Sequence, residues 1–97
     1  MIDDDKKIGI KNRLIWLIDI LTRFDYKFYT DQNVLELKYA LNSYYAMANE
    51  YPEVILEIIK SEGFDYQDFT NGVLKEAQVF IYKYDLKFKE EEKTAKI

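Results

Sequence analysis

The stretch 59–69 reads IKSEGFDYQDF, and it contains the signals that end one helix and begin another. Gly63 suits the left-handed residue that closes a helix, and Phe64 can fold back onto the helix just completed. Asp65 can cap a new helix, and Asp68 follows three residues later in a variant of the capping box. The two phenylalanines of the stretch occupy the two positions of a hydrophobic staple. We therefore predict two helices joined by a tight turn.

Upstream of this turn, apolar residues recur at steps of three and four, which predicts helices over Lys7–Phe24 and Gln32–Asn49. Thr30 or Asp31 can cap the second of these helices. A third helix, Pro52–Glu62, begins with the only proline of the chain, a residue that suits the first helical position. The expected core residues of the first two helices are Ile10, Leu14, Leu17, Leu21, Phe24, Val34, Leu37, Leu41, Tyr44 and Ala48.

Downstream of the turn, Tyr66–Glu91 carries two competing patterns. Apolar and charged residues alternate over 82–88, as in a strand, and residues 24–29 alternate in the same way. The neighbouring segments 75–78 and 90–93 are rich in helix-favouring residues, and they favour a helix over the whole stretch. The expected core stripe of that helix is Phe69, Val73, Ala77, Phe80, Tyr84 and Phe88.

These patterns predict an all-α fold, a small antiparallel helical bundle. Asn71-Gly72 can break the last helix near its start, so the expected number of helices is three to five. The alternative is an α+β fold in which residues 24–29 and 82–88 form a short hairpin.

The length of 97 residues suits one domain, which we place over residues 1–97. We expect a flexible acidic arm over residues 1–6 and a frayed tail over residues 93–97. The charged runs Asp3–Asp5 and Glu90–Glu92 are typical of solvated ends, and the first lacks the ligand spacing of a calcium loop.

Composition argues against most catalytic chemistry. The chain contains no Cys and no His, so thiolate nucleophiles, disulfides and the commonest acid–base group are absent. We expect no enzyme, no cofactor and no metal site. The net charge of −4 disfavours nucleic acid as a direct ligand, because such binding depends on neutralising phosphates. Lys83 and Lys87 lie among aromatics, as in single-strand binders, but Asp85 and the following glutamates offset them.

No membrane association is expected either. The longest apolar stretch, Leu14–Leu21, is interrupted by Asp19 and is too short to span a bilayer. Residues 1–7 lack the pattern of a secretory signal, and we expect a cytoplasmic protein.

The most specific feature lies on the first predicted helix. Arg13, Trp16, Ile20 and Arg23 follow steps of three, four and three residues, so they share a stripe that the core residues do not use. They include both arginines and the only tryptophan of the chain, and Trp and Arg are enriched at binding hot spots. The stripe is either an exposed binding anchor or a second packing face against a neighbouring helix.

Tyr39 and Tyr45 on the second predicted helix form a second candidate surface, because both fall away from the centre of its core stripe. Rings at the edge of the core are the alternative interpretation of these tyrosines.

Together these features favour a non-enzymatic interaction module or accessory subunit that docks on a larger complex. Its partner would be a protein or a second copy of the chain. The alternative is a small acidic inhibitor, antitoxin or immunity-type protein that covers a basic surface. A nucleic-acid-binding accessory protein is the weakest of the three hypotheses.

Overall fold

The computed structural model describes the backbone of residues 3–95 and the side chains of residues 3–87. Within residues 3–95 the chain is helical and contains no strand, so the predicted all-α class is confirmed and the α+β hairpin is wrong. The elements are α1 (Asp4–Arg23), α2 (Asp31–Glu50), α3 (Pro52–Ser61), α4 (Tyr66–Phe69), a π-helical turn η1 (Thr70–Leu74) and α5 (Lys75–Ala95).

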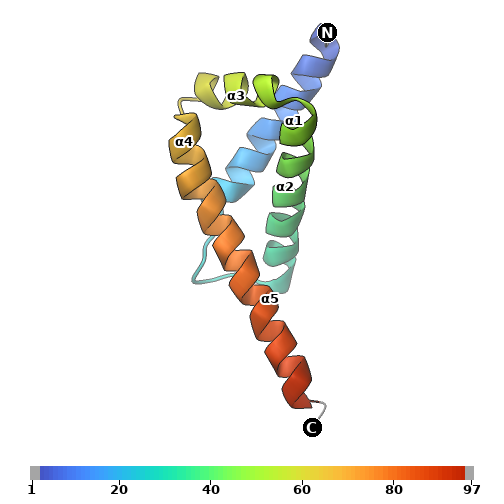
Figure 1. Ribbon diagram of the computed structural model, residues 1–97, viewed down its shortest axis with the longest axis vertical. Coiled ribbons are helices and arrows are strands. Elements are labelled where there is room, and N and C mark those ends of the chain that lie inside the picture. The colour runs from blue at the N-terminus through green and yellow to red at the C-terminus, as the bar shows by residue number, and fades with distance from the viewer. Residues whose placement is uncertain (1–2, 96–97) are drawn as a thin grey trace.

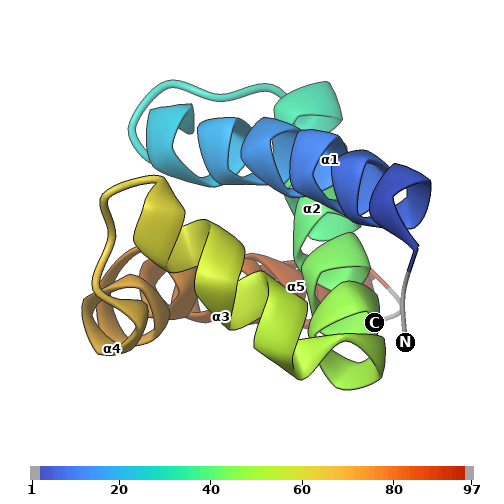
Figure 2. The same ribbon diagram turned by 90° about the horizontal axis from the view of Figure 1, so that it is seen from above.

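Figure 1 shows how these helices are arranged. α1 and α2 run in opposite directions, and α3 crosses one end of the bundle to connect α2 with α4. α4, η1 and α5 then form one rod that returns beside α2 and extends past the loop between α1 and α2. The view along the long axis shows α1, α3 and α5 placed around α2 (Figure 2). The core lies between them, and its largest fully buried side chains are Phe69, Leu14, Leu17, Leu21, Leu37, Ile55, Ile59 and Val34.

Side-chain caps set where the first two helices begin. Asp3 Oδ1 accepts a hydrogen bond from the Lys6 amide at 2.8 Å, so α1 begins at Asp4. Residues 4–6 therefore form a first helical turn in place of the predicted acidic arm. Thr30 caps α2 in a reciprocal box with Asn33, each side chain accepting from the other residue's amide at 3.1 and 3.0 Å.

The predicted turn between α3 and α4 is confirmed in detail. Gly63 has φ of 89°, and the amide of Phe64 donates to the carbonyl of Ile59 at 3.1 Å. Asp65 Oδ2 then accepts from the Asp68 amide at 3.1 Å, which caps α4. The rings of Phe64 and Phe69 meet edge to face with centroids 5.6 Å apart. The turn therefore directs α4 back along the bundle.

Replacing Gly63 with valine is expected to destabilise the protein by about 1 kcal/mol or more, because a β-branched residue resists positive φ. No atom lies within 4 Å of a Cβ built at Gly63, so the cost is conformational rather than steric. Gly9, inside α1, has equally open surroundings, and Gly9→Ala is expected to stabilise the protein by about 0.5–1 kcal/mol. Chemical denaturation measures both effects, and a loss of stability in both variants would contradict this interpretation.

The junction of α4 and α5 departs from the predicted regular helix. The π-helical turn η1 widens the helix at Asn71-Gly72, where we expected a break. A π turn spans about one residue more than an α turn, so Phe69 and Leu74, five residues apart, both reach the core. Val73, which the predicted stripe placed in the core, is only partly buried.

The loop between α1 and α2 packs against α5 through aromatic rings. Phe24, Tyr26 and Phe80 form a triangle with centroids 5.0 to 5.2 Å apart, and Tyr29 and Tyr84 extend it. Thus the segments expected to pair in the α+β alternative do lie close together, but as a loop against a helix.

At the carboxyl end, helix α5 continues to Ala95, so residues 93–95 of the expected frayed tail are helical. The core position predicted for Phe88 lies outside the described side chains, and residues 96–97 lie outside the described backbone.

Candidate protein-interaction surface

Three of the predicted residues meet on the outer face of α1 and α2. The guanidinium of Arg13 donates to the hydroxyl of Tyr39 and, at 3.4 Å, to Ser43 Oγ. It also lies over the Tyr39 ring, 5.7 Å from the centroid. Trp16 meets the same ring edge to face, with centroids 6.0 Å apart. One tyrosine thus fixes both the tryptophan and the arginine of the neighbouring helix.

Trp16 shows features of both interpretations of the stripe, because it packs against a neighbouring helix and still remains half exposed. The indole remains 49 % exposed and the Tyr39 ring 49 % exposed, and neither belongs to the buried core. Cross-helix contacts nevertheless restrict both rings and leave Arg13 with unused donors. Trp16, Tyr39 and Arg13 therefore form a partly exposed cluster of the residue types that most often anchor protein interfaces. We call these three residues the anchor cluster.

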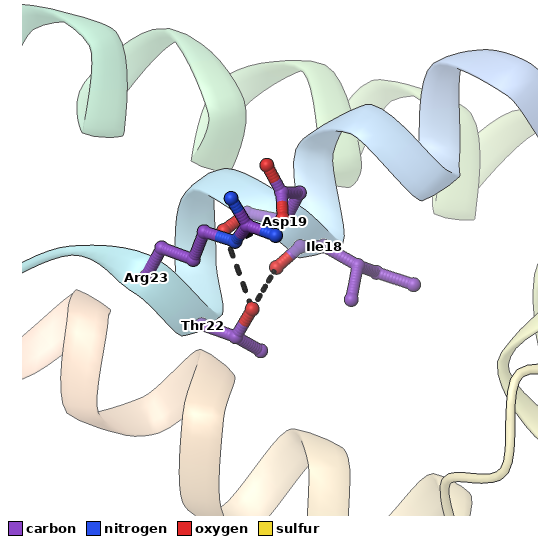
Figure 3. A network of polar contacts seen from close by, with 4 residues as sticks. All are labelled: Ile18, Asp19, Thr22 and Arg23. Carbon is purple, nitrogen blue, oxygen red and sulfur yellow. Dashed lines mark hydrogen bonds and ion pairs between the residues drawn. The ribbon is translucent and has the colours of Figure 1, made fainter.

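Ile20 and Arg23 continue the stripe toward the end of α1, in different surroundings. Ile20 is partly buried against the core, so its side chain supports the bundle more than it presents a surface. Arg23 is exposed and pairs with Asp19 at 2.7 Å, one turn earlier (Figure 3). In the same view Thr22 Oγ1 donates to the carbonyls of Ile18 and Asp19, at 2.9 and 3.2 Å.

Tyr45 lies on a different face from the anchor cluster. Its hydroxyl accepts a hydrogen bond from Gln78 of α5, and its ring meets Tyr44 edge to face. It therefore belongs to the contact between α2 and α5, where Lys38 Nζ also pairs with Asp85 at 2.6 Å. Tyr39 and Tyr45 thus contact different neighbouring helices, because Tyr39 contacts α1 and Tyr45 contacts α5.

Two shallow grooves flank the anchor cluster between α1 and α2. The first, of about 440 Å³, has Lys6 and Arg13 as its only charged lining residues, with small residues such as Gly9 and Ala46 beside them. The second, of about 310 Å³, lies past Ile20 and is lined by the charged side chains Asp19, Arg23, Asp25 and Glu36 together with aromatic residues of the loop. The face is therefore basic at one end and acidic at the other.

Sequence patterns missed two apolar side chains on or beside this face. Leu35 is exposed one turn before Tyr39, and Phe28 in the α1–α2 loop is 82 % exposed and lines the acidic groove. The spacing of Leu35 and Tyr39, four residues on one helix, is a signal that could have found the first. Phe28 lies in an irregular loop, where no periodicity predicts which way a side chain points.

Among the residues with described side chains, 3–87, no three His, Cys, Asp or Glu side chains gather as they would around a metal ion. None of the helices described here combines the length and the apolar character that crossing a membrane requires. No protein-family model, no curated protein and no solved structure matches the chain.

Proposed function

We propose that this chain is a non-enzymatic interaction module, an accessory subunit that docks on a larger protein complex through the outer face of α1 and α2. The anchor cluster carries this proposal, because Trp16 and Tyr39 stay half exposed while contacts between two helices hold them. A side chain that is already ordered loses less conformational entropy when a partner covers it. An exposed, pre-ordered tryptophan beside an arginine is therefore suited to anchoring a partner.

The lack of His and Cys supports a role in binding rather than in catalysis. Arg13 also favours a protein partner, because its remaining N–H groups can donate hydrogen bonds to a carboxylate or a carbonyl of the bound surface. The apolar surface of Trp16 and Tyr39 would supply the rest of the contact.

Affinity capture from the native host tests this function. The chain is used as bait in three forms: unchanged, Trp16→Ala, and the matched control Tyr82→Ala, which removes an exposed ring of α5. We expect Trp16→Ala to reduce the amount of a captured partner at least about tenfold, as at a hot spot, and Tyr82→Ala to leave it unchanged. Circular dichroism should show that all three baits are folded.

Equal capture by all three baits would overturn the proposal. The same experiment at high salt separates it from the acidic-inhibitor alternative, because charge-driven docking weakens with ionic strength while an apolar anchor keeps most of its affinity. Capture that is abolished by salt but unaffected by Trp16→Ala would favour the inhibitor.

A further inference from the structure

The charge on the outer face of α1 and α2 reverses across the anchor cluster. Arg13 lies three residues before Trp16 on α1, and Glu36 lies three residues before Tyr39 on α2. The two helices run in opposite directions (Figure 1). Arg13 and Glu36 therefore lie on opposite sides of the Trp16–Tyr39 contact. Both side chains are exposed.

The two grooves extend this reversal of charge. On the Arg13 side, Lys6 supplies a second cation, and no carboxylate lines the groove. A side-chain hydrogen bond with Tyr51 is the main cause that raises the pKa of Lys6, with smaller contributions from Glu50 and Asp3. On the Glu36 side, Asp19 and Asp25 add two carboxylates against the single cation Arg23, which is already paired with Asp19. Each end thus carries the charge that would attract the other.

A surface with this pattern is complementary to itself under a two-fold rotation. A two-fold axis that lies in the plane of the face and runs across the helices at the anchor cluster brings the basic end of one copy against the acidic end of the other. This gives the self-complementary contact of an isologous dimer. The overall charge of −4 opposes pairing of two copies, and this local attraction offsets part of that repulsion. Two helices of 20 residues, each about 30 Å long, present a face comparable to the roughly 800 Å² that a standard interface buries on each partner.

We propose that a second copy of this chain covers this face in the free protein. Trp16 and Tyr39 of both copies lie at the two-fold axis, and Arg13 of each copy faces Glu36 of the other. This inference rests on the proposed function, because both proposals assign binding to the outer face of α1 and α2. The second copy occupies this face until a larger partner displaces it.

Charge reversal tests the pairing, with the molecular mass followed by light scattering and the dissociation constant by sedimentation. The unchanged chain is expected to dimerise, and Arg13→Glu or Glu36→Lys alone is expected to weaken the dimer at least about tenfold, because each places like charges opposite one another twice. The control Lys83→Glu makes on α5 the same change in net charge as Arg13→Glu and is expected to leave the dimer unchanged.

Mixing the two single variants provides the decisive measurement. In a two-fold dimer of Arg13→Glu with Glu36→Lys, both cross-contacts again join opposite charges, so a heterodimer is expected at about the original affinity. The double variant is expected to dimerise by itself for the same reason. Recovery in the mixture also shows that each single variant is folded.

Three outcomes would overturn the dimer. These are a chain that stays monomeric at every concentration, a dimer that neither reversal weakens, and single variants that fail to pair when mixed. If the chain is monomeric but Trp16→Ala still reduces the captured partner, the dimer proposal is wrong and the proposed function stands. If the chain forms a dimer with this charge pattern but Trp16→Ala leaves the captured partners unchanged, the proposed function is wrong and the dimer stands.

Discussion

Replacing Phe69 with alanine is expected to lower the free energy of unfolding by about 3–5 kcal/mol, the usual cost of truncating a buried aromatic side chain. Phe69 is the largest of the fully buried side chains, and its exposed fraction is 0 %. Its ring lies 5.6 Å from Phe64 and 5.8 Å from Tyr44, measured between centroids. Removing it leaves a cavity where α2, α4 and the turn after α3 meet.

Urea denaturation followed by circular dichroism measures this loss. Tyr82→Ala, which truncates a ring that is 66 % exposed, serves as the control and is expected to change stability by no more than about 0.5 kcal/mol. A loss below about 1.5 kcal/mol at Phe69 would mean that the helices close around the missing ring.

The second large effect is expected at alkaline pH. Tyr44 is 3 % exposed, and burial raises its pKa above the ordinary value of 10, with smaller contributions from Tyr66 and Tyr45. The folded state therefore keeps a proton that the unfolded state loses, so stability is fully present below pH 10 and falls as pH rises above it. The expected slope is about 1.4 kcal/mol per pH unit for each such tyrosine.

Two further tyrosines act in the same direction. Burial raises the pKa of Tyr26, with a smaller effect of Glu76. A hydrogen bond donated to Asp31 at 2.7 Å is the main cause that raises the pKa of Tyr84 to about 12. As pH rises from 10 to about 12, the stability contributed by the hydrogen bond between Tyr84 of α5 and Asp31 at the start of α2 is expected to be lost.

Unfolding measured between about pH 8 and pH 11 tests the assignment, with Tyr44→Phe beside the unchanged chain. Tyr44→Phe is expected to lose stability less steeply above pH 10, because it removes one of the linked protons. Identical slopes for the two proteins would contradict a role for Tyr44.

Local sequence signals predicted much of this fold because they act within a few residues of one another. The cap at Thr30, the helix stop at Gly63 and the cap at Asp65 each depend on one side chain and the adjacent backbone. The π-helical turn escaped prediction because the apolar pattern was extended at α-helical spacing through residues 69–77. The extra residue of the π turn brings Leu74 into the core in place of Val73, while Ala77 is buried as the stripe predicted.

The candidate interaction surface could also be predicted in part from the sequence. Helical spacing alone placed Arg13 and Trp16 away from the core, and the structure confirms that placement. It could not reveal that Tyr39 contacts both, because that contact depends on how α1 is set against α2. Spacing could, however, have separated Tyr39 from Tyr45. Six residues correspond to a rotation of about 240° around the axis of an α-helix, so the two side chains lie on different faces.

The π-helical turn also marks the place where this protein can change length. Phe69 and Leu74 both reach the core although five residues separate them, one more than an α-helix needs to bring two side chains to the same face. Deleting a single residue between them would restore ordinary spacing and let α4 and α5 join as one continuous α-helix. Every contact downstream, from Ala77 to the aromatic rings at Phe80 and Tyr84, would keep its partners. The chain thus carries the equivalent of a one-residue insertion, stored within a helix rather than in a loop.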